Sequence, residues 1–177
     1  YQLSSKTRPS NEKDQRFYSH YLARRLEAEV LNDVICQATG YADRIEGYPE
    51  GIRAVQNPDP SVRTTFFASI SRPERVTACA CEREADISIA STLFLSGGTV
   101  IAERISHPQG RLALLLQSKK SNDAIVEELF LASLGRRPTD AEWNPLRQHL
   151  AAQTDRKVAL EEVFWAVLNA RNFLFNH

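Results

Sequence analysis

Hydrophobic positions in the last third of the chain repeat at the spacing of α-helices. The clearest repeat begins after Ser121, a residue suited to cap a helix N-terminus. It ends at Gly135, because glycine readily adopts the left-handed backbone conformation that often ends a helix. Its apolar stripe consists of Ile125, Val126, Leu129, Phe130 and Leu134. We therefore expect a helix between Ser121 and Gly135.

Two further amphipathic segments follow, each with its own start signal. Thr139 and Glu142 have the spacing of a capping box, and Thr154 and Asp155 begin the final helix. The two apolar stripes are Trp143, Leu146 and Leu150, then Leu160, Val163, Phe164, Val167, Leu168 and Phe173. Because the connections are short, we expect the last three helices to form an antiparallel bundle.

The first half begins with a long predicted helix, from about Ser19 to Thr39. Ser19 is its expected N-cap and Gly40 its expected end. Its stripe consists of Leu22, Leu26, Val30, Leu31, Val34, Ile35 and Ala38. Arg25 and Glu29 have i,i+4 spacing and can pair on the solvent face, or an arginine here can point into a polar pocket.

The middle of the chain is irregular. Glycines and prolines interrupt residues 41–62, where Ile52 and Val55 are expected to anchor the loop, and 64–70 can be a helical turn or a buried strand. Short helices are expected at 87–96, 99–106 and 112–116. The predicted fold class is all-α, with a long N-terminal helix, an irregular middle segment and a C-terminal antiparallel three-helix bundle. Residues 1–16 are expected to be a polar lead-in from a preceding region, and 17–177 a single helical domain.

Composition narrows the range of partners. The 177 residues include 22 basic and 22 acidic side chains, and this balance argues against electrostatic capture of nucleic acid. No apolar run reaches the roughly 18 residues that a membrane-spanning helix needs. The chain starts with Tyr1 and shows no signal-peptide pattern, so we expect it to be a piece of a longer protein.

Charge, thiols and a proline coincide between Arg72 and Arg83. The candidate binding residues here are Arg72, Arg75, Glu82 and Arg83, because arginine side chains can hold an anion or a carboxylate through two parallel hydrogen bonds. Equally, these arginines can pair with neighbouring glutamates and fix loops to helices. No histidine is marked by its local sequence as a catalytic base, so the catalytic residues are unknown.

The chain has three cysteines, Cys36, Cys79 and Cys81. They can be small buried hydrophobic residues, or Cys36 can form a disulfide with Cys79 or Cys81. The spacing of Cys79 and Cys81 is not that of a zinc knuckle, and no haem-attachment motif occurs. We expect no metal and no cofactor in this segment.

Several separated motifs resemble one family. They are Arg24-Arg25-Leu26-Glu27-Ala28-Glu29-Val30, Arg72-Pro73-Glu74-Arg75, Cys79-Ala80-Cys81-Glu82-Arg83, Leu134-Gly135-Arg136-Arg137-Pro138-Thr139, and the C-terminal segment 168–177. Together they resemble the C-terminal domain of uncharacterised planctomycete-type proteins, domain of unknown function fifteen fifty-three. Cys36 departs from the usual pattern of that family. The resemblance implies an exported, extracytoplasmic protein, often joined to a cytochrome-c-like domain, with no established catalytic residues.

Three functions remain open. The leading prediction is a non-catalytic helical interaction module of a larger exported protein, which binds sister domains of the same polypeptide, another protein or a polysaccharide. The second is part of an extracytoplasmic enzyme that acts on polysaccharide or another polymer. The third is a thiol redox module in which Cys79 and Cys81 act beside a cytochrome-like partner.

Overall fold

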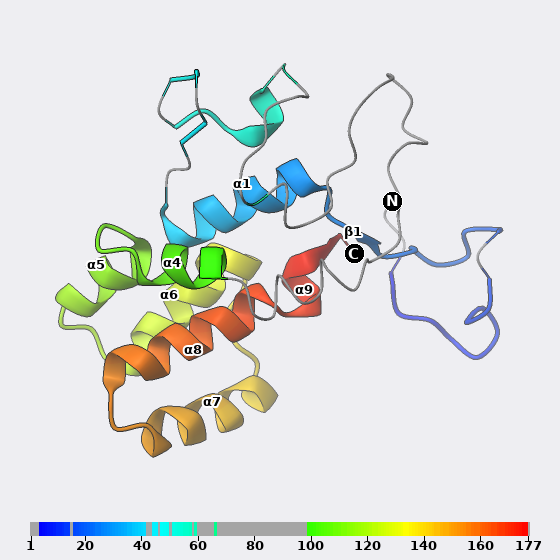
Figure 1. Ribbon diagram of the computed structural model, residues 1–177. Coiled ribbons are helices and arrows are strands. Elements are labelled where there is room, and N and C mark those ends of the chain that lie inside the picture. The colour runs from blue at the N-terminus through cyan, green and yellow to red at the C-terminus, as the bar shows by residue number, and fades with distance from the viewer. Residues whose placement is uncertain are drawn as a thin grey trace.

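The protein is helical, as predicted (Figure 1). The computed structural model describes residues 4–14, 16–41, 44–45, 47–49, 51–57, 59, 66 and 99–176. The helices are α1 (Ala28–Thr39), α4 (Thr99–Ser106), α5 (Arg111–Gln117), α6 (Asn122–Leu134), α7 (Asp140–Ala152), α8 (Arg156–Leu168) and α9 (Arg171–Leu174), with the short 3-10 helix η1 at Ala54–Gln56. Two short strands, β1 (Arg24–Arg25) and β2 (Phe175–Asn176), pair antiparallel.

Local capping determines where the C-terminal helices begin. The Ser121 side chain accepts a hydrogen bond from the Ala124 backbone N–H and caps α6. Thr139 and Glu142 form the predicted capping box at the start of α7. Asp155 caps α8 by accepting hydrogen bonds from two backbone N–H groups. The predicted starts are therefore confirmed, because each depends on residues within one helical turn.

Helix α8 lies in the middle of the core and contacts α4, α6 and α7 (Figure 1). Leu160 and Phe164 of α8 are fully buried, and Ile125 and Leu129 of α6 are buried with them. Helix α7 packs on α8 but contains no fully buried residue. Since α1 and α4 share the same core, the separate antiparallel three-helix bundle stays a prediction.

The predicted start of the first helix is wrong. Helix α1 begins at Ala28 after Glu27, and the Ser19 backbone N–H instead donates to Asp14. Arg24 and Arg25 lie in β1, which pairs with β2 at the far end of the chain. The pairing of β1 with β2 keeps Arg24 and Arg25 out of the helix, although their sequence fits a helical pattern. An i,i+4 pair requires both residues in one helix, and Arg25 lies before the start of α1 whereas Glu29 lies within it.

The C-terminal and middle segments need smaller corrections. The last predicted helix ends at Leu168. Phe173, predicted to be buried as part of that helix, is buried but belongs to the separate helix α9. In the middle, Ile45 and Ala54 are buried, whereas the predicted anchor Val55 is 46% exposed. The predicted helix at 99–106 is confirmed as α4.

Some expectations for the middle fall on residues that the structure does not describe. The predicted helix at 87–96 lies outside the described residues. Of the segment 64–70 only Phe66 is described, and it is helical and buried. Among the described residues, no helix is long and apolar enough to cross a membrane.

Candidate functional site

The predicted binding residues Arg72, Arg75, Glu82 and Arg83 lie outside the described residues, as do the thiol candidates Cys79 and Cys81. Cys36 lies in α1 and is half-buried. The described ranges contain no group of three or more His, Cys, Asp or Glu side chains that could hold a metal ion. The roles assigned to the segment between Arg72 and Arg83 therefore stay predictions.

A buried arginine joins α4 to α1. Arg104 of α4 is 4% exposed, and its Nη2 donates a 2.9 Å hydrogen bond to Oδ1 of the buried Asn32. The guanidinium carbon lies 4.9 Å from the ring centroid of Phe66 and 5.4 Å from that of Tyr41. The ring faces stabilise the positive charge in this water-poor position.

The end of α1 completes this structural joint. Arg111 Nε donates to the Ala38 carbonyl at 2.7 Å and Nη2 donates to the Gln37 carbonyl at 3.0 Å. Two carbonyls near the helix C-terminus, which carries negative partial charge, thus bind a cation. Because the side chains of the joint are used to hold α1, α4 and α5 together, it is a structural element.

Sequence reasoning missed Arg104, although a signal was present. Arg104 lies between Ile101 and Ile105 on the apolar face of α4. A basic residue on an apolar stripe is rarely buried unless it has partners. Its position therefore indicated a buried, partnered charge.

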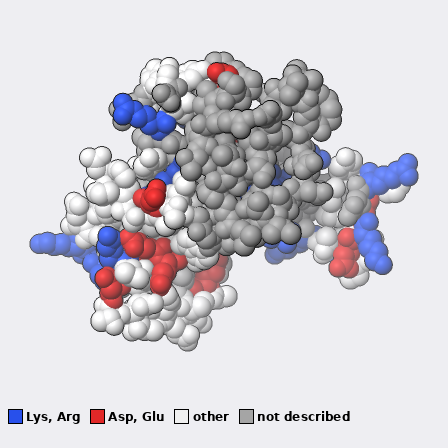
Figure 2. Space-filling view, in the orientation of Figure 1, with Lys and Arg blue, Asp and Glu red and all other residues white. Residues whose placement is uncertain are grey.

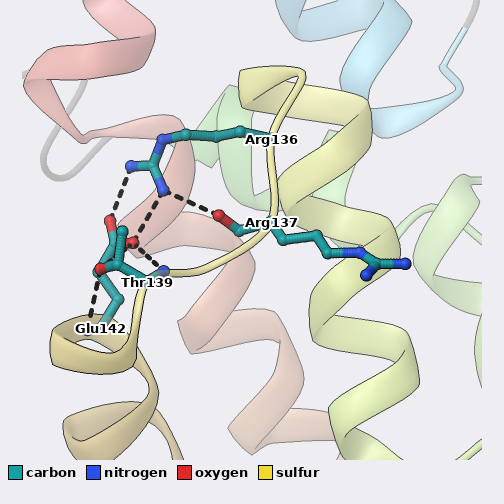
Figure 3. Close-up of polar contacts among 4 residues, drawn as sticks. All are labelled: Arg136, Arg137, Thr139 and Glu142. Atoms are coloured by element: carbon teal, nitrogen blue, oxygen red, sulfur yellow. Dashed lines mark hydrogen bonds and ion pairs between the residues drawn. The ribbon is translucent and has the colours of Figure 1, made fainter.

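A second polar cluster joins the α6–α7 turn to the start of α7 (Figure 3). Arg136 forms two hydrogen bonds with Glu142, each 2.8 Å long, one to each carboxylate oxygen. The Thr139 backbone N–H and hydroxyl also donate to Glu142, at 2.7 and 2.8 Å. Hydrogen bonds from Arg136, which have the largest effect, and from Thr139 lower the pKa of Glu142 to about 2. A carboxylate with this pKa and these partners stays ionised and cannot act as a proton donor near neutral pH.

The third cluster is an open hollow in the N-terminal segment, with a volume of roughly 1000 Å³. Its lining residues, here called the basic hollow, are Ser4, Lys6, Arg8, Ser10, Asn11, Lys13, Asp14, Arg16, Phe17, Ser19 and His20. Figure 2 shows Lys and Arg side chains projecting from this segment at the right of the view, with acidic side chains beside them. The hollow spans the predicted polar lead-in, residues 1–16, and the residues up to the predicted helix start near Ser19.

Asp14 holds the backbone of the basic hollow in a tight turn. Its Oδ1 accepts from the backbone N–H groups of Arg16 and Phe17 at 3.0 and 2.8 Å, and its Oδ2 accepts from Ser19 N–H at 3.0 Å. A hydrogen bond from the Ser19 side chain, followed by these backbone donors, lowers the pKa of Asp14 well below its usual range. Both oxygens of this carboxylate therefore already accept hydrogen bonds from residues of the same turn.

The cations of the hollow are available. Across the described ranges, no carboxylate forms an ion pair with Lys6, Arg8 or Lys13. Arg16 lies over the Phe17 ring, 5.8 Å from its centroid. The buried His20 is 7% exposed, and its Nδ1 has no hydrogen-bond partner in the described part of the chain. The arrangement can bind negatively charged groups through electrostatics and hydrogen bonds.

Comparison with known proteins decides the family. A family model described as PSD1, protein of unknown function (DUF1553), matches residues 1–150. The chain belongs to this family. The predicted resemblance is thus confirmed, and the DUF1553 match includes both the basic hollow and the Arg104 joint. Neither the search of curated proteins nor the search of solved structures finds a match for this DUF1553 chain.

Proposed function

We propose that this chain is a non-catalytic helical interaction module of a larger exported protein, and that it binds a sister domain of the same polypeptide. The observation that carries the proposal is the contrast between the helical body and the N-terminal turn. Several charged side chains of the helical body form ion pairs, such as Arg136 with Glu142 and Arg147 with Asp123, whereas in the turn Lys6, Arg8 and Lys13 form no ion pair with a described residue and the aromatic rings are exposed.

The paired charges of the body have structural roles. Arg147 of α7 binds Asp123 of α6 at 2.7 Å, and Arg156 of α8 donates to Asn122 and to the Lys120 carbonyl. These contacts join the starts of α6 and α8 and bring α7 to them. A general acid or base instead needs an accessible oxygen or nitrogen that can exchange a proton with a substrate.

The exposed aromatic rings suit a protein partner. Phe17 is 81% exposed and Tyr18 is 61% exposed. Tyr18 also has a φ of 53°, a left-handed conformation that costs a residue with a side chain about 1–2 kcal/mol. The turn around Asp14 holds this conformation. Aromatic and arginine side chains contribute much of the binding energy at protein interfaces, so a partner that covers them gains apolar burial.

The other two functions depend on residues outside the described ranges. The enzyme hypothesis uses Arg75, Glu82 and Arg83, and the redox hypothesis uses Cys79 and Cys81. The exported location and the cytochrome-like neighbour are proposed from the family resemblance alone. No contact among the described residues favours catalysis or thiol chemistry over docking.

Isothermal titration calorimetry tests the docking proposal. This chain is titrated with the remaining domains of its parent polypeptide, purified as a separate protein. We expect saturable binding that is weakened at least about tenfold by Phe17→Ser with Tyr18→Ser, because two exposed rings lose their burial.

A matched control carries Leu114→Ser with Val158→Ser. These side chains, on α5 and α8, are 58% and 40% exposed and lie outside the N-terminal turn, so binding is expected to be unchanged. Absence of association, or equal weakening by both pairs of substitutions, would refute the proposal.

A further inference from the structure

We propose that the basic hollow binds an acidic peptide segment of the docking partner. This inference rests on the proposed docking function and adds the chemistry of the partner. The hollow contains four basic side chains, Lys6, Arg8, Lys13 and Arg16, against a single carboxylate, Asp14. Asp14 is hydrogen-bonded to its own turn, and the exposed Glu12 of the same segment does not line the hollow, so the lining has a net positive charge.

One residue that lines the hollow has a buried polar atom without a described partner. His20 lines the hollow and is only 7% exposed. Its Nδ1 lacks a hydrogen-bond partner in the described part of the chain. A buried polar atom without a partner costs free energy, and such atoms in native proteins usually bind a protein group, a water or a ligand. Because Nδ1 exposes less than 1 Å², a bound carboxylate or backbone group can supply this partner once the side chains around it shift.

The size of the hollow favours a chain over a single ion. A volume of roughly 1000 Å³ equals the upper end of the range for pockets that hold drug-sized ligands. The lining carries four cations, from Lys6 to Arg16, so one small anion balances only part of their charge. A peptide with several carboxylates can contact them at successive residues.

The chemistry of the lining favours a peptide with apolar as well as acidic side chains. Phe17 lines the hollow beside Arg16, and the adjacent Tyr18 ring is also exposed. An inorganic anion gains nothing from these rings, whereas apolar peptide side chains bury against them. Elsewhere in this chain, arginines with a carboxylate in reach bind it directly, as Arg136 binds Glu142. The hollow offers the same chemistry to a partner.

Fluorescence anisotropy tests the inference. The probe is a fluorescein-labelled peptide of Glu-Ala-Glu-Leu repeats, added to the whole 177-residue chain. We expect saturable binding that weakens as salt is raised. The triple variant Lys6→Gln, Arg8→Gln, Lys13→Gln is expected to bind about tenfold more weakly, since it loses three exposed charge pairs.

Two further variants make the test specific. The triple variant Lys119→Gln, Lys120→Gln, Lys157→Gln removes the same charge from the helical body and is expected to bind like the wild type. His20→Phe is similar in volume and is expected to weaken binding about threefold by losing one hydrogen bond. Circular dichroism confirms that each variant is folded.

Three results would overturn the inference, and a fourth would overturn the docking proposal alone. Equal weakening by the two triple variants would mean that only net charge matters. Binding of heparin through Lys6, Arg8 and Lys13 without binding of the peptide would assign the hollow to a sulfated polysaccharide. If the parent domains bind the wild type and the Lys6, Arg8, Lys13 variant equally, docking stands and the hollow has no part in it. If the peptide binds but the parent domains do not, the docking proposal fails and the acidic-peptide site remains.

Discussion

At the scale of single residues, two arginines show how this chain uses charge inside its fold. Arg104 is buried between two aromatic rings and bound to Asn32, and Arg136 is half-exposed and bound through Nη1 and Nη2 to Glu142. Each connects elements that are not held by apolar contacts alone. Their different burial predicts different consequences when they are replaced.

Replacing Arg104 is expected to destabilise the protein strongly. Arg104→Met leaves Asn32 buried without its donor, and Asn32→Leu leaves the cation without this acceptor. We expect each change to cost about 2–3 kcal/mol in the free energy of unfolding. The double variant is expected to cost about 1–2 kcal/mol less than the sum of the two, because it leaves neither partner unsatisfied. Urea unfolding measures all four proteins, and strictly additive costs would contradict the coupling.

The Arg136–Glu142 pair predicts a pH dependence of stability. The pKa of Glu142 is lowered from 4.5 to about 2 in the fold, so its ionised form stabilises the fold above pH 4.5. This contribution is lost as the pH falls from 4.5 towards 2. Since both side chains are 35% exposed, solvent screening reduces the effect to about 1 kcal/mol.

Urea unfolding of the wild type and Glu142→Gln across this pH range provides the check. The stability difference is expected to be about 1 kcal/mol at neutral pH and to disappear near pH 2. Arg136→Gln is expected to show the same trend. A difference that stays constant down to pH 2 would contradict the assignment of the stabilising charge to Glu142.

At the scale of elements, helix ends determine how the segments are joined. Gly40 and Gly135 both end helices in the left-handed conformation, with φ of 68° and 65°. Their surroundings differ, because a Cβ on Gly40 would lie 3.1 Å from the Arg111 backbone nitrogen, whereas a Cβ on Gly135 would meet no atom within 4 Å. The end of α1 is thus packed against α5, and the end of α6 is open.

This difference predicts unequal costs for the same substitution. Gly135→Ala is expected to cost about 1 kcal/mol, from the backbone conformation alone. Gly40→Ala is expected to cost at least about 1 kcal/mol more, because the added methyl group must displace the start of α5. Thermal unfolding of both variants measures the difference. Equal melting temperatures would show that the start of α5 can move away from residue 40 without loss of stability.

Elements whose limits depend on neighbouring residues could be predicted from the sequence. Ser121, Thr139 with Glu142, and Gly40 each act within one helical turn, so their patterns were sufficient. The start of α1 could not be predicted, because Arg24 and Arg25 pair with residues 175–176 at the opposite end of the chain. The basic hollow was missed for a related reason, since a polar segment without periodicity gives no sign that Asp14 will organise it.

At the scale of the whole molecule, the described residues form two regions with different properties. The helical body around α8 has a continuous apolar core and internal charge pairs. The N-terminal segment of residues 4–20 has exposed rings and cations, and none of its described residues belongs to the apolar core. Neutral net charge thus hides an uneven distribution, in which basic side chains outnumber acidic ones in the lining of the hollow.

Amide hydrogen exchange, read by mass spectrometry, tests the docking account most directly. The whole chain is compared alone and in the presence of the remaining domains of its parent polypeptide. We predict slower exchange in residues 4–20 when the partner is present, with α6 and α8 unchanged, because the partner covers the basic hollow and its rings. Protection confined to the helical body, or no protection anywhere, would contradict the account.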